Sequence, residues 1–383
     1  MIYLDNAATT KVAGCAINAM VTSLNGNYGN PSNIHSKGVE AKSIIQTAKQ
    51  NVRELLNASA LDQIVFTSGG TEANNLAIHG MTSRLKKIGL TTIVLSAIEH
   101  PSVYEACQTL ERDGFNVIEV PVDQYGVIDL LALRNIFKRN NVGLVSVMSV
   151  NNETGAIQPI EEIGALCWEY RAYFHTDAVQ AIGHIDVDVE ESKIDLLTFT
   201  GHKIHAPKGI GVLYVRRDTP LKKIIDGGHQ GNNLRPGTEN VPGIVAIDTA
   251  LKRMKSFFYQ DNCLFKSLRN AFFTRLFDLG VKFTVNADGI SSIISLTLPG
   301  FESESMLLIL DSMGICVSSG SACNSGNHSS SRVLMAMGLT ERDASCTIRI
   351  SMSKFNSKKD MIACAEGIAR AIEQMKQLNN EIK

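Results

Sequence analysis

Short apolar runs rich in β-branched residues alternate with longer amphipathic stretches between about residue 40 and residue 250. This alternation is typical of βαβ units, in which a helix connects two strands of a mainly parallel sheet. Gly, Asn, Pro or a charged residue bounds each run, as expected at the ends of strands. The pattern therefore predicts seven strands, at residues 64–67, 92–96, 117–121, 144–150, 173–177, 196–200 and 211–215.

After residue 250 the strand–helix alternation stops. Helical spacing of apolar residues continues to about residue 280 and returns near the end of the chain. Between these stretches lies a run of Ser and Gly that is too polar for a core element, so a loop is expected there. The pattern predicts helices at residues 244–280 and 360–378, a strand at 291–298 and a loop at about 317–332.

The two patterns together predict an α/β fold with two domains. The chain has 383 residues, whereas one domain usually has about 100 to 200, so length agrees with this division. We expect a large domain over residues 14–250, built around a mainly parallel sheet of seven strands. Residues 1–13 and 251–383 are expected to form a smaller α+β domain that carries the loop at about 317–332.

Composition excludes several classes of protein. The 37 Lys and Arg residues nearly balance 38 Asp and Glu, so the chain lacks the basic surface expected of a nucleic-acid-binding protein. No apolar run approaches the roughly 18 residues of a membrane span, and residues 1–5 do not look like a secretory leader. The eight cysteines form no C-x-x-C pair, so neither a disulfide framework nor a metal site is predicted. A soluble, cytoplasmic protein is therefore expected.

Polar segments, most of them with glycine or a charged residue, follow five of the predicted strands. In open α/β sheets, ligands bind beyond the carboxyl ends of the strands, so these segments are expected to line one crevice. They are residues 68–75, 97–102, 151–155, 177–180 and 201–203.

The segment SGGTEANN at residues 68–75 suits an anion. Its glycines allow close approach of the backbone, the first N–H groups of the following helix are unpaired, and the Thr71 hydroxyl adds a donor. It lacks the lysine of a P-loop and does not match G-x-G-x-x-G. The alternative is an ordinary strand-to-helix turn capped by Ser68 or Thr71.

Lys203 and Asp177 extend this phosphate hypothesis to a cofactor. Lys203 follows a predicted strand beside hydroxyl and imidazole groups, and a desolvated lysine amine can form a Schiff base with an aldehyde. Asp177 ends another predicted strand, where a carboxylate can keep a pyridine nitrogen protonated. A lysine, a carboxylate and a phosphate cradle are the three parts of a pyridoxal phosphate site. For Asp177 alone, a helix N-cap is the alternative.

Three further residues allow two interpretations each. His100 is either a turn histidine or a ring that stacks on the cofactor and moves protons near neutral pH. Cys323, in the predicted loop, is either an inert surface thiol or a nucleophile on a flexible arm. Arg349 alternates with apolar residues, so it is either a solvent-facing charge on a strand or a fork that binds a substrate carboxylate.

Nine motifs together resemble the NifS/IscS-type cysteine desulfurases, over nearly the whole chain and in the same order. They are LDNAATT (4–10), GNPSNIHS (29–36), SGGTEANNLAI (68–78), EHPSV (99–103), VNNETG (150–155), HTDAVQ (175–180), TGHKIHAPKGIG (200–211), RPGTENVPGIV (235–245) and SSGSAC (318–323). The resemblance implies the aspartate-aminotransferase-like fold of type I pyridoxal phosphate enzymes and a homodimer.

The resemblance also implies roles for individual residues. It places Lys203 in a Schiff base with pyridoxal 5'-phosphate, Asp177 on the pyridine nitrogen and His100 over the ring. Residues expected to contact the phenolic oxygen or the phosphate are Asn152, Gln180, Gly70, Thr71, Thr200 and His202, with Thr238 of the partner subunit. Arg349 and Asn152 are expected to hold the substrate carboxylate, and Cys323 to take up the sulfur.

The function implied is conversion of L-cysteine to L-alanine, with the sulfur captured as a persulfide on Cys323. The sulfur is expected to pass to an acceptor protein for iron–sulfur cluster assembly, tRNA thiolation or DNA phosphorothioation. Alternatives are a selenocysteine lyase, another aminotransferase-fold enzyme that has no use for Cys323, and a noncatalytic docking protein that keeps the fold. A dehydrogenase is disfavoured because no dinucleotide-binding motif follows a predicted strand.

Overall fold

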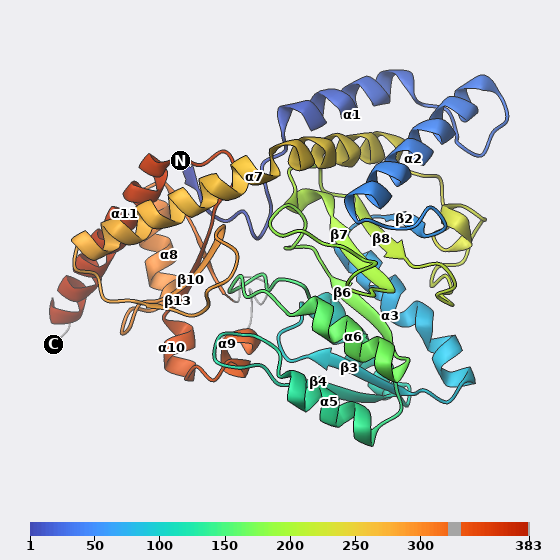
Figure 1. The fold of residues 1–383 in the computed structure, drawn as a ribbon. Coiled ribbons are helices and arrows are strands. Elements are labelled where there is room, and N and C mark those ends of the chain that lie inside the picture. The colour runs from blue at the N-terminus through green and yellow to red at the C-terminus, as the bar shows by residue number, and fades with distance from the viewer. Residues whose placement is uncertain (321–330, 382–383) are drawn as a thin grey trace.

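The computed structural model describes residues 1–320 and 331–381. Two lobes lie side by side, and the long helix α7 (Val241–Asp278) runs along both (Figure 1). One lobe contains a seven-stranded sheet and the other a four-stranded sheet. The architecture is therefore α/β with a smaller α+β part, as the sequence predicts.

The seven-stranded sheet has the order β2-β8-β7-β6-β5-β3-β4. Only β8 runs antiparallel to its neighbours, so the sheet is mainly parallel. Four of the inner strands, β3, β5, β7 and β8, are buried at every position, which explains their largely apolar runs. The strands are β2 (Gln63–Thr67), β3 (Thr92–Ser96), β4 (Asn116–Val120), β5 (Val142–Ser146), β6 (Tyr173–Asp177), β7 (Leu196–Thr200) and β8 (Gly211–Val215).

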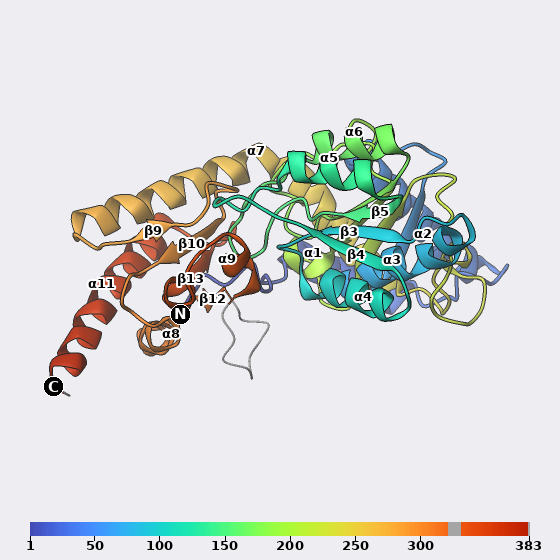
Figure 2. The same cartoon turned by 90° about the horizontal axis from the view of Figure 1, so that it is seen from below.

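Helices cover both faces of this sheet. In Figure 2, α5 and α6 lie over one face and α3 and α4 over the other. The first face packs in a core that also takes in α1, α2 and the N-terminal half of α7, and the second face packs in a separate core with α3 and α4. The helices are α1 (Gly14–Gly26), α2 (Ser36–Leu55), α3 (Gly70–Lys87), α4 (Pro101–Arg112), α5 (Leu130–Arg139) and α6 (Ile160–Tyr170).

The smaller lobe is built on the antiparallel sheet β12-β13-β10-β9, with the pair β1-β11 beside it. Its helices α8 and α11 and the second half of α7 pack a third core. The elements are β1 (Ile2–Tyr3), β9 (Thr284–Val285), β10 (Ile293–Thr297), α8 (Ser303–Ser312), β11 (Ile315–Cys316), β12 (Ser318–Ser319), α9 (Arg332–Ala336), α10 (Glu341–Ser345), β13 (Thr347–Ser351) and α11 (Lys358–Glu381).

The expected boundary at residue 250 falls inside α7, which is one continuous helix. Its first half contributes Val241 to Met254 to the core of the large sheet, and its second half contributes Phe265 to Leu276 to the core of the smaller lobe. Leu4 packs in the core of the smaller lobe, and Ala13 packs in the core of the large sheet that includes α1 and α2. We therefore propose the same two domains, residues 14–250 against 1–13 and 251–383, with α7 shared between them.

Six of the seven predicted strands match the structure to within one residue, and one does not. The prediction at 144–150 is wrong at both ends, because β5 runs from Val142 to Ser146. Beyond Ser146 the apolar residues Val147, Met148 and Val150 stay buried, and the N–H groups of Val147 and Ser149 still donate to the carbonyls of His175 and Asp177 in β6, although the regular strand has ended. Among the described residues, no helix has the length and apolar character needed to cross a membrane.

Candidate active site

A cavity of about 350 Å³ opens at the carboxyl ends of β6 and β7, between the two sheets. It is lined from both lobes, because the N-terminal segment and β13 of the smaller lobe reach it. Ten of the predicted site residues line this cavity: Gly70, Thr71, His100, Asn152, Asp177, Gln180, Thr200, His202, Lys203 and Arg349.

Two predicted site residues are not part of this cavity. Thr238 lines a separate cavity of about 290 Å³, together with Ser68 and Arg235. Its expected role was assigned to the partner subunit, so its position in a single chain does not bear on that role. Cys323 lies outside the described residues.

Asp177 is the last residue of β6 and is buried. Its Oδ1 accepts a hydrogen bond from the Val179 N–H at 2.9 Å, and its Oδ2 accepts one from Nδ2 of Asn74 at 2.7 Å. Asn74 also donates to Oγ of Ser102 at 2.8 Å, while its own Oδ1 is buried and has no hydrogen-bond partner among the described residues. The carboxylate is thus held by fixed donors at the floor of the cavity.

His100 lies directly before α4 and caps it. Its Nδ1 accepts a hydrogen bond from the Ser102 N–H at 3.1 Å and contacts the Ser102 hydroxyl at 2.8 Å. Because Nδ1 accepts from the backbone, the neutral ring carries its proton on Nε2. Burial lowers the pKa of His100, the positive charge of Lys203 lowers it further, and the negative charge of Asp177 acts in the opposite direction. The turn-histidine and the cofactor interpretations are both compatible with this position.

Lys203 ends the short helix η1 (Gly201–Lys203) that follows β7. Its Nζ donates hydrogen bonds to the backbone carbonyls of Ala7 and Ala8, the latter at 2.7 Å. Gln180 donates to the same Ala7 carbonyl at 2.9 Å. Burial lowers the pKa of His202 to about 4, with a further contribution from Lys203. The N-terminal segment of the smaller lobe therefore closes one side of the lysine site.

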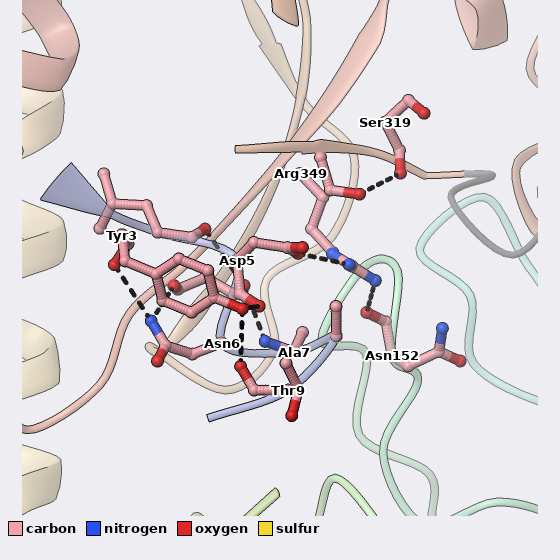
Figure 3. A network of polar contacts seen from close by, with 12 residues as sticks. Tyr3, Asp5, Asn6, Ala7, Thr9, Asn152, Ser319 and Arg349 are labelled. Atoms are coloured by element: carbon pink, nitrogen blue, oxygen red, sulfur yellow. Dashed lines mark hydrogen bonds and ion pairs between the residues drawn. The ribbon is translucent and has the colours of Figure 1, made fainter. Parts of the chain in front are cut away.

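Arg349 lies on β13 and is only 3% exposed, so the solvent-facing interpretation is wrong. Figure 3 shows its guanidinium between Asp5 and Asn152. One terminal nitrogen pairs with Oδ1 of Asp5 at 2.8 Å and the other donates to the Asn152 carbonyl at 3.0 Å. The Nε is buried without a partner among the described residues. An unpaired donor of a buried cation at the cavity wall suits an anionic group of a ligand.

The start of α3 has the geometry of an anion cradle. Neither Ser68 nor Thr71 caps the helix, because its N-cap is Gly69 with no side-chain hydrogen bond. The first N–H groups of α3 have no acceptor within the helix. A Cβ on Gly70 would lie 3.3 Å from Cγ2 of Val179, so a larger residue would crowd this end of the cavity. The backbone amides can therefore reach a phosphate directly.

The residues of the cavity fit pyridoxal 5'-phosphate. A buried carboxylate suits a pyridine nitrogen, the amides at the start of α3 suit a phosphate, and the Lys203 amine suits an aldehyde. The unpartnered Oδ1 of Asn74 and Nε of Arg349 indicate that the site is built for a ligand with polar groups.

Sequence reasoning missed several polar residues of the site. Asn74 orients Asp177, Ser102 orients His100, and Asp5 pairs with Arg349. Asn74 lies four residues after Gly70 and therefore on the same side of α3, which is the one signal that could have indicated it. Asp5 and Ser102 belong to the motifs LDNAATT and EHPSV, but nothing local distinguishes them from solvent-facing residues.

Comparison with known proteins agrees with this geometry. The family model for Aminotransferase class-V matches residues 2–363. The putative cysteine desulfurase IscS 1 of Bacillus subtilis (strain 168) is 41% identical over 378 residues, 98% of this chain and 99% of that protein. A solved structure described as a NifS-like protein has a TM-score of 0.90 at 32% identity and covers 97% of this chain and 99% of its own.

A second solved structure, described as SspA in complex with cysteine, is also 32% identical. Its TM-score is 0.82, and the match covers 93% of this chain and all of that one, 100%. Family model, relatives and solved structures thus agree over almost the whole chain. This protein belongs to the class-V aminotransferases, among the NifS/IscS-type cysteine desulfurases, which are pyridoxal phosphate-dependent enzymes.

Proposed function

We propose that this enzyme converts L-cysteine to L-alanine and captures the sulfur as a persulfide on Cys323. The thiolate of Cys323 bonds to the substrate sulfur, the Cβ–S bond breaks, and the electron pair left on Cβ takes up a proton. One thiol and one cysteine thereby become one persulfide and one alanine. The observation that supports this most is the single cavity that brings Lys203, Asp177 and Arg349 together from three separate elements. A structural relative described as a complex with cysteine also supports the substrate.

Most of the cavity residues are proposed to hold the cofactor. Asp177 would pair with the pyridine nitrogen, Gly70, Thr71, Thr200 and His202 with the phosphate, and Asn152 and Gln180 with the phenolic oxygen. When bound, pyridoxal phosphate supplies an electron sink that stabilises negative charge on the Cα of an amino acid. We also propose a homodimer in which Thr238 of the partner subunit completes the phosphate site.

Two groups of this chain are proposed to move protons. Lys203 reaches the cavity from the end of η1, and its Nζ is the amine placed to take the proton from Cα. The neutral His100 ring carries its proton on Nε2, since Ser102 occupies Nδ1. That proton is available to the carbon or the sulfur of the substrate. Both side chains are only partly exposed, which limits the access of bulk water to these transfers.

Arg349→Lys is expected to raise the KM for L-cysteine about 10- to 150-fold, because a hydrogen bond to a charged group contributes about 1.5 to 3 kcal/mol. A lysine keeps the charge beside Asp5 but loses the planar fork and its Nε donor. Steady-state kinetics measure the effect. Arg269→Lys is the control, because Arg269 donates to a backbone carbonyl of the smaller lobe outside the cavity. An unchanged KM in Arg349→Lys would show that another group binds the carboxylate.

The limb of the kcat/KM pH profile that belongs to the His100 imidazole is expected below pH 6.5. Since burial lowers the pKa of His100, the ring stays neutral at pH 6.5 and becomes charged only at lower pH. The neutral form is the one that carries out the proposed transfer. In His100→Gln, kcat is expected to fall about 100-fold. The limb of the pH profile that belongs to the imidazole is expected to disappear. If the limb below pH 6.5 persists in His100→Gln, the assignment to the imidazole is contradicted.

One assay tests the proposed function as a whole. Enzyme loaded with pyridoxal phosphate is incubated with ³⁵S-labelled L-cysteine, and L-alanine and protein-bound label are measured before and after reduction with a thiol. We expect alanine and reducible label with the wild type and neither with Cys323→Ala. Cys316→Ala is the matched control, because Cys316 lies on β11 at the edge of the smaller lobe.

Two outcomes would favour another enzyme of the same fold. Full turnover of cysteine by Cys323→Ala would remove the proposed sulfur carrier. Turnover of L-selenocysteine without turnover of L-cysteine would indicate a selenocysteine lyase. If label does transfer from Cys323, candidate acceptors are proteins of iron–sulfur assembly, tRNA thiolation or DNA phosphorothioation, and each can be tested by adding it to the labelled enzyme.

A further inference from the structure

The carboxylate of Glu153 contacts both of the residues that flank residues 321–330, Gly320 and Ser331. The proposed mechanism does not use this carboxylate. Oε2 of Glu153 accepts a hydrogen bond from Oγ of Ser331 at 2.5 Å. A Cβ on Gly320 would lie 2.8 Å from the same oxygen, so this residue packs directly against the carboxylate. Glu153 therefore contacts the last described residue before this segment and the first one after it.

Ser331 also begins the helix that follows. The same Oγ accepts a hydrogen bond from the Leu334 N–H at 3.2 Å and so caps α9. Its hydrogen bond to Glu153 then ties the start of α9 to the turn after Asn152, which lines the active-site cavity. The hydroxyl thus has two functions, and only one of them is local to the helix.

Arg332 makes a second connection at the same place. Its guanidinium donates hydrogen bonds to the backbone carbonyls of Ala97 and Glu99, and it lies 4.1 Å from the ring centre of Tyr104. Glu99 directly precedes His100 in the chain. Two consecutive residues, Ser331 and Arg332, are thus held by the two turns that carry Asn152 and His100.

Charge around Glu153 makes its hydrogen bond a strong one. Burial raises the pKa of Glu153 to about 7, while the Ser331 hydroxyl and the positive charges of Arg349 and Arg332 act to lower it. Removal of the Glu153 carboxylate would leave the Ser331 hydroxyl without its acceptor and would take a negative charge from beside Arg349 and Arg332. Glu153 itself does not line the active-site cavity.

We propose that Glu153 and Ser331 are positioning residues for sulfur transfer, which together with Arg332 anchor the base of the segment carrying Cys323 to the turns of Asn152 and His100. The inference rests on the proposed role of Cys323. In sequence, Cys323 is three residues from Gly320 and eight from Ser331. Each residue spans at most about 3.3 to 3.6 Å, so displacement of either end lowers the effective concentration of the thiolate at the substrate sulfur.

The test compares two substrates in variants of the anchor. Attack by Cys323 is needed to remove sulfur, whereas selenium is the better leaving atom and its removal does not require that attack. In Glu153→Ala and in Ser331→Ala, kcat for L-cysteine is expected to fall about 10- to 150-fold, as for loss of a hydrogen bond to a charged group. The KM for L-cysteine and the kcat for L-selenocysteine, measured as L-alanine formed, are expected to stay at the wild-type value.

A double-variant cycle and a matched control sharpen this test. Because the two groups act through one hydrogen bond, Glu153→Ala with Ser331→Ala is expected to lose no more activity than the worse single variant. Thr340→Ala is the control: Thr340 caps α10 and donates to the carboxylate of Asp343 at 2.7 Å, but neither residue lines the cavity. The Thr340→Ala variant is expected to turn over both L-cysteine and L-selenocysteine at the wild-type rate. Ser331→Thr keeps the hydroxyl and is expected to restore turnover of cysteine.

Three results overturn the inference. They are equal losses with both substrates, additive losses in the double variant, or wild-type turnover of cysteine in Glu153→Ala. If Glu153→Ala does not fold, Ser331→Ala against Ser331→Thr decides the question. Cys323→Ala, run in parallel, separates this inference from the proposed function. If that variant turns over cysteine normally, the proposed function fails, whereas an inactive Cys323→Ala beside fully active anchor variants contradicts the anchor alone.

Discussion

Lys203→Ala is expected to lower kcat for L-cysteine by about 10⁴-fold, the upper end of what one positioned proton-transfer group contributes. Among the described residues that line the cavity, Lys203 is the only lysine. No other described lining residue carries an amine that could replace Nζ, which the carbonyls of Ala7 and Ala8 hold in place. The measurement is L-alanine formed per enzyme under single-turnover and steady-state conditions.

Lys208→Ala is the matched control for this result. Lys208 lies in the same motif, TGHKIHAPKGIG, but is exposed and does not line the cavity. It is expected to retain wild-type kcat. Cofactor bound to Lys203→Ala, followed by its absorbance, separates loss of chemistry from loss of binding. If Lys203→Ala keeps more than about 1% of the wild-type kcat, the base in the Cα proton step must be another group.

Asp177→Asn is expected to lower kcat about 10³-fold, as when one preorganised charged group that stabilises the transition state is removed. The substitution keeps the shape of the side chain. It also keeps a partner for Asn74, because the unpaired Oδ1 of Asn74 can accept a hydrogen bond from the new amide after a flip of its own amide. The loss then reports the negative charge rather than the packing.

Asn74→Ala separates charge from orientation in this result. It removes one donor to Asp177 and leaves the carboxylate charged, so a loss of about tenfold is expected, equal to about 1.4 kcal/mol. The kcat of both variants is measured together with their thermal unfolding. If Asp177→Asn loses no more activity than Asn74→Ala, the charge of Asp177 is not what the reaction needs.

The strands of the large sheet were predictable because each is short, apolar and bounded by residues that disfavour a strand. β3, β6, β7 and β8 have the predicted bounds. β5 ends at Ser146, although the residues after it stay buried and Val147 and Ser149 still donate backbone hydrogen bonds to β6. A continuous apolar run therefore does not fix where a buried strand ends.

The candidate site was predictable where a motif brought several polar residues together at the end of a strand. Arg349 shows the limit of this reasoning. On a strand of alternating character its side chain could face solvent or core, and only the position of β13 opposite the large sheet places it beside Asn152. Glu153 was part of the motif VNNETG, but its contact with Ser331 joins residues 178 positions apart.

By itself, the sequence determined the α/β class, the approximate bounds of the main elements and the residue types of a pyridoxal phosphate site. These features depend on periodicity and turn residues, which act between near neighbours in the chain. The tertiary structure alone decided the strand order, the sharing of α7 by both lobes and the meeting of Lys203 with Arg349. These depend on contacts between distant segments, for which local pattern carries no information because many pairings of the same elements bury their apolar faces equally.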